Sequence, residues 1–215
     1  MKTKSQISHI LTEIARMYPD IRTELDYETP FQFLIAVILS AQTTDKQVNK
    51  TTPPLFTLVR EPEDIGNLSL AEVERFVSSV NFYKNKAKFI RQSGEKLVHE
   101  FGGIIPNDLK KIQSLPGVGV KTAKVVLAVL YDAPYVGVDT HVHRVMNRIG
   151  IVKTKTPEET DRVLEKKLTH EQKLIIHHPL VLFGRYHCMA RKPKCESCPI
   201  REMCDYGEKM FKGEE

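Results

Sequence analysis

The chain has 215 residues, of which 41% are hydrophobic and 27% are charged, and its formal net charge is +5. This length allows one large domain or two small ones, and the apolar content is sufficient for a core. No segment approaches the roughly 20 consecutive apolar residues of a membrane helix, and residues 1–17 lack the apolar segment of a signal peptide. We therefore expect a protein of the reducing cytoplasm that has no membrane partner.

Three segments have the pattern of a helical capping box, in which a hydroxyl residue stands three positions before Gln or Glu. They are Thr29–Gln32, Ser69–Glu72 and Thr156–Glu159. In the first and third, proline follows the hydroxyl residue, as is common at the first position of a helix. The first box begins the apolar run of residues 31–41, which predicts a buried helix.

The rest of the chain also predicts helices. Between residues 84 and 101 the apolar residues recur at helical spacing, and the Gly102-Gly103 pair predicts the end of that helix. Residues 133–138 are rich in strand-forming types, but the segment is short and contains a proline. The sequence therefore predicts an all-α fold, with helices of about 10–18 residues joined by short turns.

Basic residues gather in three runs that contain no acidic residue. Residues 84–91, 110–124 and 185–194 each hold four lysines or arginines. Any one run taken alone is better explained as a solvated face. Because each run lies beside one of the motifs described below, we interpret the three together as a surface that binds the phosphates of a nucleic acid.

A glycine-rich turn joins two predicted helices at residues 115–123, which read LPGVGVKTA. Glycine permits positive φ and close backbone approach, so we expect a turn too tight for side chains, with the amides of the following helix forming an anion site. An ordinary turn between helices contains one glycine, whereas G-x-G followed by a basic residue favours a helix-hairpin-helix that holds a DNA backbone, at residues 108–131. The hairpin residues expected to contact DNA are Gly117, Gly119, Val120 and Thr122.

All the cysteines lie near the C-terminus in the spacing C-x6-C-x2-C-x5-C, at Cys188, Cys195, Cys198 and Cys204. Four clustered thiolates indicate a metal site, and disulfides are disfavoured in a reducing compartment. Structural zinc modules more often pair two C-x2-C knuckles, whereas one C-x2-C with wide flanking gaps suits the four irons of a [4Fe–4S] cluster. The spacing favours iron–sulfur and leaves zinc open.

Over almost its whole length, the chain resembles the endonuclease III family of DNA base-excision glycosylases. The resemblance is carried by LSAQTTD at residues 39–45, LPGVGVKTA at 115–123, VDTH at 138–141, HHPL at 177–180, GRY at 184–186 and the cysteine spacing. It implies a [4Fe–4S] cluster and two helical lobes with a groove between them. One lobe is a helical barrel domain of residues 22–133, and the other is an iron–sulfur domain of residues 1–21 and 134–215.

Two residues are candidates for catalysis. A lysine amine can attack the electron-poor C1′ of a nucleotide that loses its base and form a Schiff base there. Spacing alone allows Lys121, at the mouth of the hairpin, to be either this nucleophile or a phosphate contact, and the resemblance assigns it the nucleophile. Asp139 is expected to cap the helix that follows it. The resemblance adds a catalytic role, in which Asp139 deprotonates the lysine or a water, and implies that it faces Lys121 across the groove.

An enzyme that acts on a base within a duplex must flip that base out and fill the gap. The resemblance implies that Gln42 fills the gap and that Phe82 wedges into the opposite strand, at a position where relatives often carry leucine. Core packing is the alternative for Phe82. Asp45 is expected to orient the extruded nucleotide, and His141 to lie at the DNA site. The basic residues expected beside phosphates near the cysteines are Arg185, Arg191, Lys192 and Lys194.

These features together predict a bifunctional DNA N-glycosylase and AP lyase of base-excision repair. It would act as a monomer at the nucleoid, on double-stranded DNA with damaged or abasic sites. It would remove an oxidised pyrimidine and cleave the strand by β-elimination. The alternatives are a monofunctional thymine or uracil mismatch glycosylase, in which the hairpin lysine is absent, a non-catalytic DNA-binding protein with a structural cluster, and a zinc-stabilised nucleic-acid protein of another class.

Overall fold

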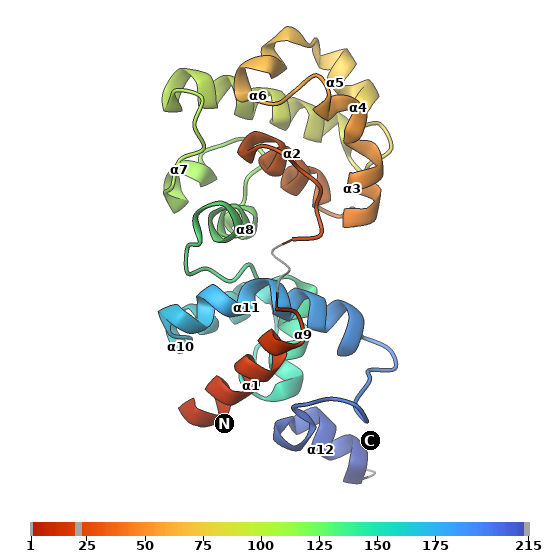
Figure 1. The fold of residues 1–215 in the computed structure, drawn as a ribbon, viewed down its shortest axis with the longest axis vertical. Coiled ribbons are helices and arrows are strands. Elements are labelled where there is room, and N and C mark those ends of the chain that lie inside the picture. The colour runs from red at the N-terminus through yellow and green to blue at the C-terminus, as the bar shows by residue number, and fades with distance from the viewer. Residues whose placement is uncertain (1, 20–22, 213–215) are drawn as a thin grey trace. The chain divides into compact units, whose positions relative to one another are not determined.

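The computed structural model describes residues 2–19 and 23–212, which form helices joined by turns and loops and contain no strand (Figure 1). The predicted all-α fold is confirmed. The chain divides into two compact units. We call Thr23–Tyr131 the central unit, and Met1–Arg22 together with Asp132–Glu215 the terminal unit. Among the described residues, no helix is both long enough and apolar enough to span a membrane.

The helices of the central unit are α2 (Pro30–Ser40), α3 (Asp45–Thr51), α4 (Pro53–Phe56), η1 (Pro62–Asn67), α5 (Leu70–Phe76), α6 (Tyr83–Phe101), α7 (Leu109–Gln113) and α8 (Val120–Tyr131). Every residue of α2 from Phe31 to Leu39 is buried. A helix that is apolar on all sides has no solvent face, and α6 and α8 accordingly pack against α2. The expected helix lengths are wrong for α3, α4, α5 and α7, which have seven, four, seven and five residues.

The elements of the terminal unit are α1 (Lys4–Arg16), α9 (Thr140–Ile149), α10 (Pro157–Lys167), α11 (His170–Leu182), the π-helical turn η2 (Phe183–His187), η3 (Arg201–Met203) and α12 (Asp205–Lys212). α11 packs against both α1 and α9 (Figure 1). Buried residues of these helices form one apolar core, which includes Ile10, Ile14, Val145 and Ile176. The N-terminal helix is therefore part of the same unit as residues 188–204, which contain the four cysteines and which we call the cysteine segment.

All three predicted capping residues lie at the start of a helix, but only one of the three forms the reciprocal pair of hydrogen bonds of a capping box. Ser69 and Glu72 form a reciprocal capping box at α5. Thr29 accepts a hydrogen bond from the Gln32 amide at α2, but the Gln32 side chain accepts from the amide of Glu28 instead of that of Thr29. At α10, Thr156 likewise accepts a hydrogen bond from the Glu159 amide, but the Glu159 side chain accepts from the amide of Lys155 instead of that of Thr156. The C-terminal end of α6 lies where the sequence predicts it, because Gly102, the residue after the helix, adopts the left-handed conformation (φ 61°).

Candidate functional site

The glycine-rich turn lies between α7 and α8 of the central unit, so these elements form the predicted helix-hairpin-helix. Ile112, Leu115 and Val118 are buried and fix the turn from inside. Gly117 has φ 78°, and a Cβ added to it would lie 2.8 Å from the Phe89 side chain on α6. Only glycine therefore fits at this position without a shift of the neighbouring helix.

The expectation that the turn is too tight for side chains is wrong at Gly119. A Cβ added there would meet no atom within 4 Å. The Gly119 carbonyl accepts a hydrogen bond from the Ala123 amide (2.9 Å), which is the first bond of α8. Gly119 thus presents bare backbone to open space at the start of the helix, so the absence of its side chain matters only to a partner that approaches from outside.

Lys121 lies in the first turn of α8, and its side chain is exposed. Backbone amides in the first turn of a helix have no partners within the helix. The N-terminal end of α8 therefore offers an anion both the cationic side chain of Lys121 and backbone N–H donors. Val120 beside it is also exposed, while Thr122 is half-buried. Lys124, from the same basic run, is only 4% exposed, and that run therefore does not form a continuous basic face.

Asp139, in the terminal unit, is the N-cap of α9. Its Oδ1 accepts a hydrogen bond from the Val142 amide (2.8 Å), which confirms the predicted capping role. Two residues after Asp139, the Nδ1 atom of His141 lies 3.2 Å from the guanidinium of Arg144. The cap fixes the carboxylate at the end of a helix that is itself well anchored, as described below.

Gln42 and Phe82 share an uncommon backbone conformation in the central unit. Gln42 follows α2 with φ 56°, and Phe82 is the N-cap of α6 with φ 57°. Left-handed conformation is unfavourable for non-glycine residues and concentrates at functional sites. Both side chains are exposed, Phe82 to 63%, so the core-packing alternative for Phe82 is wrong. Asp45 is the first residue of α3, immediately after the Gln42 loop.

The basic run on α6 was interpreted as surface, and this is wrong for one residue. Lys86 is 5% exposed, and its ammonium donates to the carbonyls of Leu39 (2.8 Å) and Ala41 (2.6 Å) and to the Thr43 hydroxyl (3.1 Å). The sequence does contain a signal for this burial. Lys86 is four positions before Ile90 and thus on the apolar face of its helix.

None of the four cysteines forms a disulfide, and all four line one cavity of the terminal unit together with residues that include Phe183, His187 and Ile200. Burial raises the pKa of the Cys198 thiol to about 11, and it also raises the pKa of Cys195 and Cys204. Bound metal cations reverse this preference, because thiolates are the ligating form. In the part of the chain that the structure describes, no three His, Cys, Asp or Glu side chains converge on a single-ion site.

The cavity also contains a polar atom without a hydrogen-bond partner. His187 is buried and stacks on Phe183 with ring centroids 5.0 Å apart, and its Nε2 makes no hydrogen bond. Buried polar atoms are nearly always satisfied, so a further polar group is expected there. A [4Fe–4S] cluster takes one thiolate per iron and carries sulfide and thiolate acceptors. The four thiols and the unsatisfied histidine therefore fit such a cluster.

Two arginines of α9 fix the start of the cysteine segment. Arg144 donates to the carbonyls of Gly184 (2.6 Å) and Cys188 (3.2 Å). Arg148 donates to the carbonyls of Met189 (2.6 Å) and Ala190 (3.0 Å). The one signal in the sequence that singles out these arginines is their spacing of four residues, which places both on one face of the helix.

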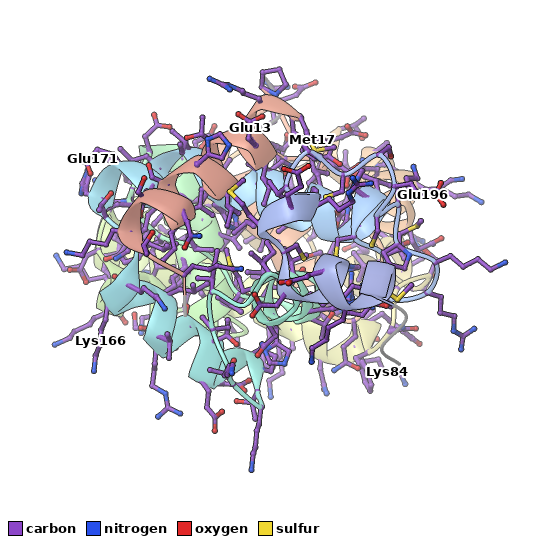
Figure 2. All side chains as sticks on the ribbon, turned by 90° about the horizontal axis from the view of Figure 1, so that it is seen from below. Glu13, Met17, Lys84, Lys166, Glu171 and Glu196 are labelled. Carbon is purple, nitrogen blue, oxygen red and sulfur yellow. The ribbon has the colours of Figure 1, made fainter. Side chains whose placement is uncertain are left out.

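The cysteine segment presents its charged residues to solvent. Glu196, between two of the cysteines, points outward (Figure 2). Arg185 is half-buried and has an interaction partner within the protein. The basic residues of the segment that are exposed are Arg191, Lys192 and Lys194.

The family comparisons agree with this geometry. Residues 35–170 match the model of the HhH-GPD superfamily of base excision DNA repair proteins. Residues 188–204, which begin and end at cysteines, match the iron-sulfur binding domain of endonuclease III. The protein therefore has a [4Fe–4S] cofactor, and the alternative of a zinc site is set aside.

Individual relatives match over nearly the full length. Endonuclease III of Bacillus subtilis is 40% identical over 213 residues, which cover 99% of this chain and 97% of the relative. The structure of a trapped endonuclease III–DNA covalent intermediate, an estranged-adenine complex, is 42% identical with a TM-score of 0.90, and covers 98% of this chain and 100% of that one.

A thermostable thymine-DNA glycosylase shares the fold at 24% identity, with a TM-score of 0.83 over 95% of this chain and 98% of that one. On the strength of the two family models and the full-length relatives, the chain belongs to the endonuclease III family of base-excision DNA repair enzymes.

Proposed function

We propose that Lys121 and Asp139 carry out the chemistry of a bifunctional DNA N-glycosylase and AP lyase. The observation that carries the proposal is the exposed amine of Lys121 in the first turn of the helix that follows the hairpin. The neutral amine attacks C1′ of the damaged nucleotide, the C1′–N bond breaks, and the base leaves with the bonding electrons and takes up a proton. Opening of the sugar ring and loss of the amine proton then give an imine between Lys121 and C1′.

The imine prepares the sugar for strand cleavage. It withdraws electrons from C2′, so that C2′ loses a proton and the 3′ phosphate leaves by β-elimination. Water then hydrolyses the imine and restores the amine. In this scheme Asp139 accepts the proton of the attacking amine and stabilises positive charge on the sugar. A carboxylate accepts several hydrogen bonds, so the cap that Asp139 forms at α9 is compatible with this role.

Two further side chains act on the opened duplex in this proposal. Gln42 occupies the gap that the flipped nucleotide leaves, because its amide both donates and accepts hydrogen bonds. Phe82 inserts between bases of the opposite strand as an apolar wedge. Their exposure and their left-handed backbone support these roles. Asp45 and His141 contact the extruded nucleotide and its surroundings.

The remaining contacts hold the DNA backbone and the cluster. The hairpin binds phosphates through Gly117, Gly119, Val120 and Thr122. Arg185 of η2 and the exposed Arg191, Lys192 and Lys194 of the cysteine segment bind phosphates as well. The ligands of the [4Fe–4S] cluster are Cys188, Cys195, Cys198 and Cys204. When bound, the cluster organises this segment and takes no part in base release, which requires no electron transfer. The protein acts as a monomer on nucleoid DNA in the cytoplasm.

The substrate we propose is an oxidised pyrimidine in duplex DNA, or an abasic site. The experiment that tests this function is a panel of duplexes, each with one oxidised pyrimidine, one uracil, one thymine opposite guanine, or no damage. Base release and strand cleavage are measured separately, with and without alkali. We expect oxidised pyrimidines to be released and the strand to be cleaved without alkali. Cleavage that requires alkali would instead indicate a monofunctional glycosylase, and no release from any duplex would indicate a non-catalytic protein.

A further inference from the structure

Lys86 is a buried lysine whose three ammonium hydrogens are all used in the central unit. An ammonium has three donors and no acceptor, and those of Lys86 bind two carbonyls and one hydroxyl, of Leu39, Ala41 and Thr43. These partners lie within five consecutive residues at the end of α2. A buried charge is tolerated only when it is hydrogen-bonded in this way. The loop that contains Gln42 is therefore organised around one side chain of another helix.

The position of the ammonium suits the end of a helix. α2 ends at Ser40, and the last carbonyls of a helix have no partners within it and carry partial negative charge. Lys86 satisfies the Leu39 carbonyl and that of Ala41, the residue that caps α2. Lys86 thus acts as a C-cap for α2 that is supplied by α6.

The cap holds a strained loop. Gln42, between Ala41 and Thr43, has φ 56° and an exposed side chain, so its own packing does not offset the unfavourable backbone. Its carbonyl accepts a hydrogen bond from the Asn81 side chain (2.7 Å). Lys86 binds the residues on both sides of it. These bonds explain how the left-handed conformation persists.

The same lysine also fixes Phe82. The Lys86 amide donates to the Phe82 carbonyl (3.1 Å), which is the first hydrogen bond of α6. Phe82 has φ 57° and no side-chain cap. Lys86 therefore binds Phe82 through its backbone, and the residues flanking Gln42 through its side chain. Asn81, the neighbour of Phe82 in the chain, adds a second link to the Gln42 loop through its bond to the Gln42 carbonyl.

We propose that Lys86 is a positioning residue for the opening of the duplex, which sets the spacing between the Gln42 and Phe82 side chains. The inference rests on the roles proposed above for these two residues. Lys86 itself touches neither DNA nor the reacting atoms. Loss of the ammonium releases the end of α2 and lets Gln42 leave the left-handed conformation, while α6 and Phe82 remain in place. Flipping of the damaged nucleotide then becomes slow, whereas the chemistry at an accessible abasic site is unaffected.

The test uses the full-length protein with its cluster and compares Lys86→Met, which keeps the length of the side chain, with Lys86→Arg. The matched control is Lys50→Met, an exposed lysine of α3 in the same unit. Flipping is followed by fluorescence of 2-aminopurine placed opposite an oxidised pyrimidine in a duplex. Imine formation is followed by borohydride trapping on a single-stranded oligonucleotide with an abasic site, which needs no flipping.

For Lys86→Met we expect flipping and base release to slow by about 10- to 100-fold, because small misplacement of a positioning group costs that much. Single-strand trapping and cluster absorbance should stay within about twofold of the wild type, and Lys86→Arg should recover part of the flipping rate. Flipping at the wild-type rate would overturn the inference. An equal loss on duplex and single strand, with a lower melting temperature, would also overturn it by showing a merely structural role.

A milder variant keeps the inference testable if Lys86→Met does not fold. Asn81→Ala removes one hydrogen bond to the Gln42 carbonyl from an exposed residue, and it should slow flipping in the same assay by a smaller factor, with trapping retained. No slowing in Asn81→Ala would contradict the inference. A wild-type protein that neither traps nor releases a base would instead refute the proposed function, and this outcome differs from all the others.

Discussion

The hairpin and the cysteine segment are both basic regions, but different forces hold them in place. The hairpin, which consists of α7, α8 and the turn between them, contributes several apolar side chains to the core of the central unit, among them Ile112, Leu115 and Val126. Among the described residues of the segment 188–204, Ile200 is the one that is buried. That segment is fixed instead by hydrogen bonds from two arginines of α9, Arg144 to the Cys188 carbonyl and Arg148 to the Met189 carbonyl.

The difference shows which region depends on the cofactor. Ordering one residue costs about 1–2 kcal/mol of backbone entropy, whereas full burial of one large aliphatic side chain stabilises by about 1.5–3 kcal/mol. One buried isoleucine and four partly buried side chains, those of Cys188, Cys198, Met203 and Cys204, cannot offset the ordering of residues 188–204. Metal binding is coupled to folding in such segments, so we expect the cluster to supply most of the remaining free energy.

The largest expected effect is therefore that of iron removal, which should separate the two regions. Chelation of the iron, or Cys198→Ser, should abolish the broad absorbance near roughly 400 nm that iron–sulfur proteins show. Hydrogen exchange should rise throughout residues 188–204 and stay nearly unchanged in residues 109–131. Ser197→Ala, an exposed neighbour of Cys198, is the matched control and should keep both properties. Equal loss of protection in the two regions would contradict the comparison.

The second prediction separates structure from chemistry in α9, the helix that anchors the cysteine segment. Asparagine is as good an N-cap as aspartate, so Asp139→Asn should keep α9, the cluster and DNA binding. Base release should slow by about 10²–10⁴-fold, the usual contribution of a positioned acid–base group. Single-turnover base release and cluster absorbance measure these two effects. If absorbance falls together with the rate, the role of Asp139 is capping alone.

The third prediction compares the two glycines of the hairpin. Gly117→Ala should lower the free energy of unfolding by about 1–3 kcal/mol, since it combines a positive φ with a close approach to Phe89. Gly119→Ala should change that free energy by less than about 0.5 kcal/mol, but it should weaken binding to undamaged duplex. Urea unfolding and DNA titration measure the two effects. Equal destabilisation by both variants would show that the steric difference has no consequence.

The smallest expected effect concerns the charges that both regions present. Affinity for undamaged duplex should fall with salt, with a slope of log K against log salt on the order of −3 to −6. When Arg191, Lys192 and Lys194 are replaced by glutamine, the magnitude of this slope should fall by about 2–3, because each lost phosphate contact removes roughly 0.9. The slope is obtained from titrations at several salt concentrations. An unchanged slope would show that the exposed charges of the cysteine segment are only solvated.

Much of the fold could be predicted because its signals are local. The buried helix α2 follows from an uninterrupted apolar run, and Asp139 was predictable as a cap because capping depends only on the next three residues. The short helices α3 and α4 were not, and the capping box of α5 predicts its start but not its length, because a few residues show little periodicity and tertiary packing decides where such helices end.

The candidate site was less predictable where its contacts join distant segments. Lys86 lies in a basic run, which favours a surface interpretation. Its spacing from Ile90 indicates the apolar face of α6, but only the structure shows that the Leu39 and Ala41 carbonyls receive its ammonium there. Gly119 was assigned the same steric role as Gly117 because both lie in one motif. Sequence spacing does not say which of the two glycines has α6 behind it.

The central claim is that Lys121 forms an imine with the sugar, and borohydride trapping tests it most directly. Borohydride added during reaction with an abasic or damaged duplex should give a stable covalent protein–DNA adduct with the wild type, because only an imine is reduced to a stable link. Lys121→Gln should abolish the adduct and strand cleavage but retain most DNA binding, whereas Lys111→Gln, an equal loss of charge on α7, should still be trapped. Equal trapping by Lys121→Gln and the wild type would place the nucleophile elsewhere, and loss of binding together with activity would make Lys121 a phosphate contact.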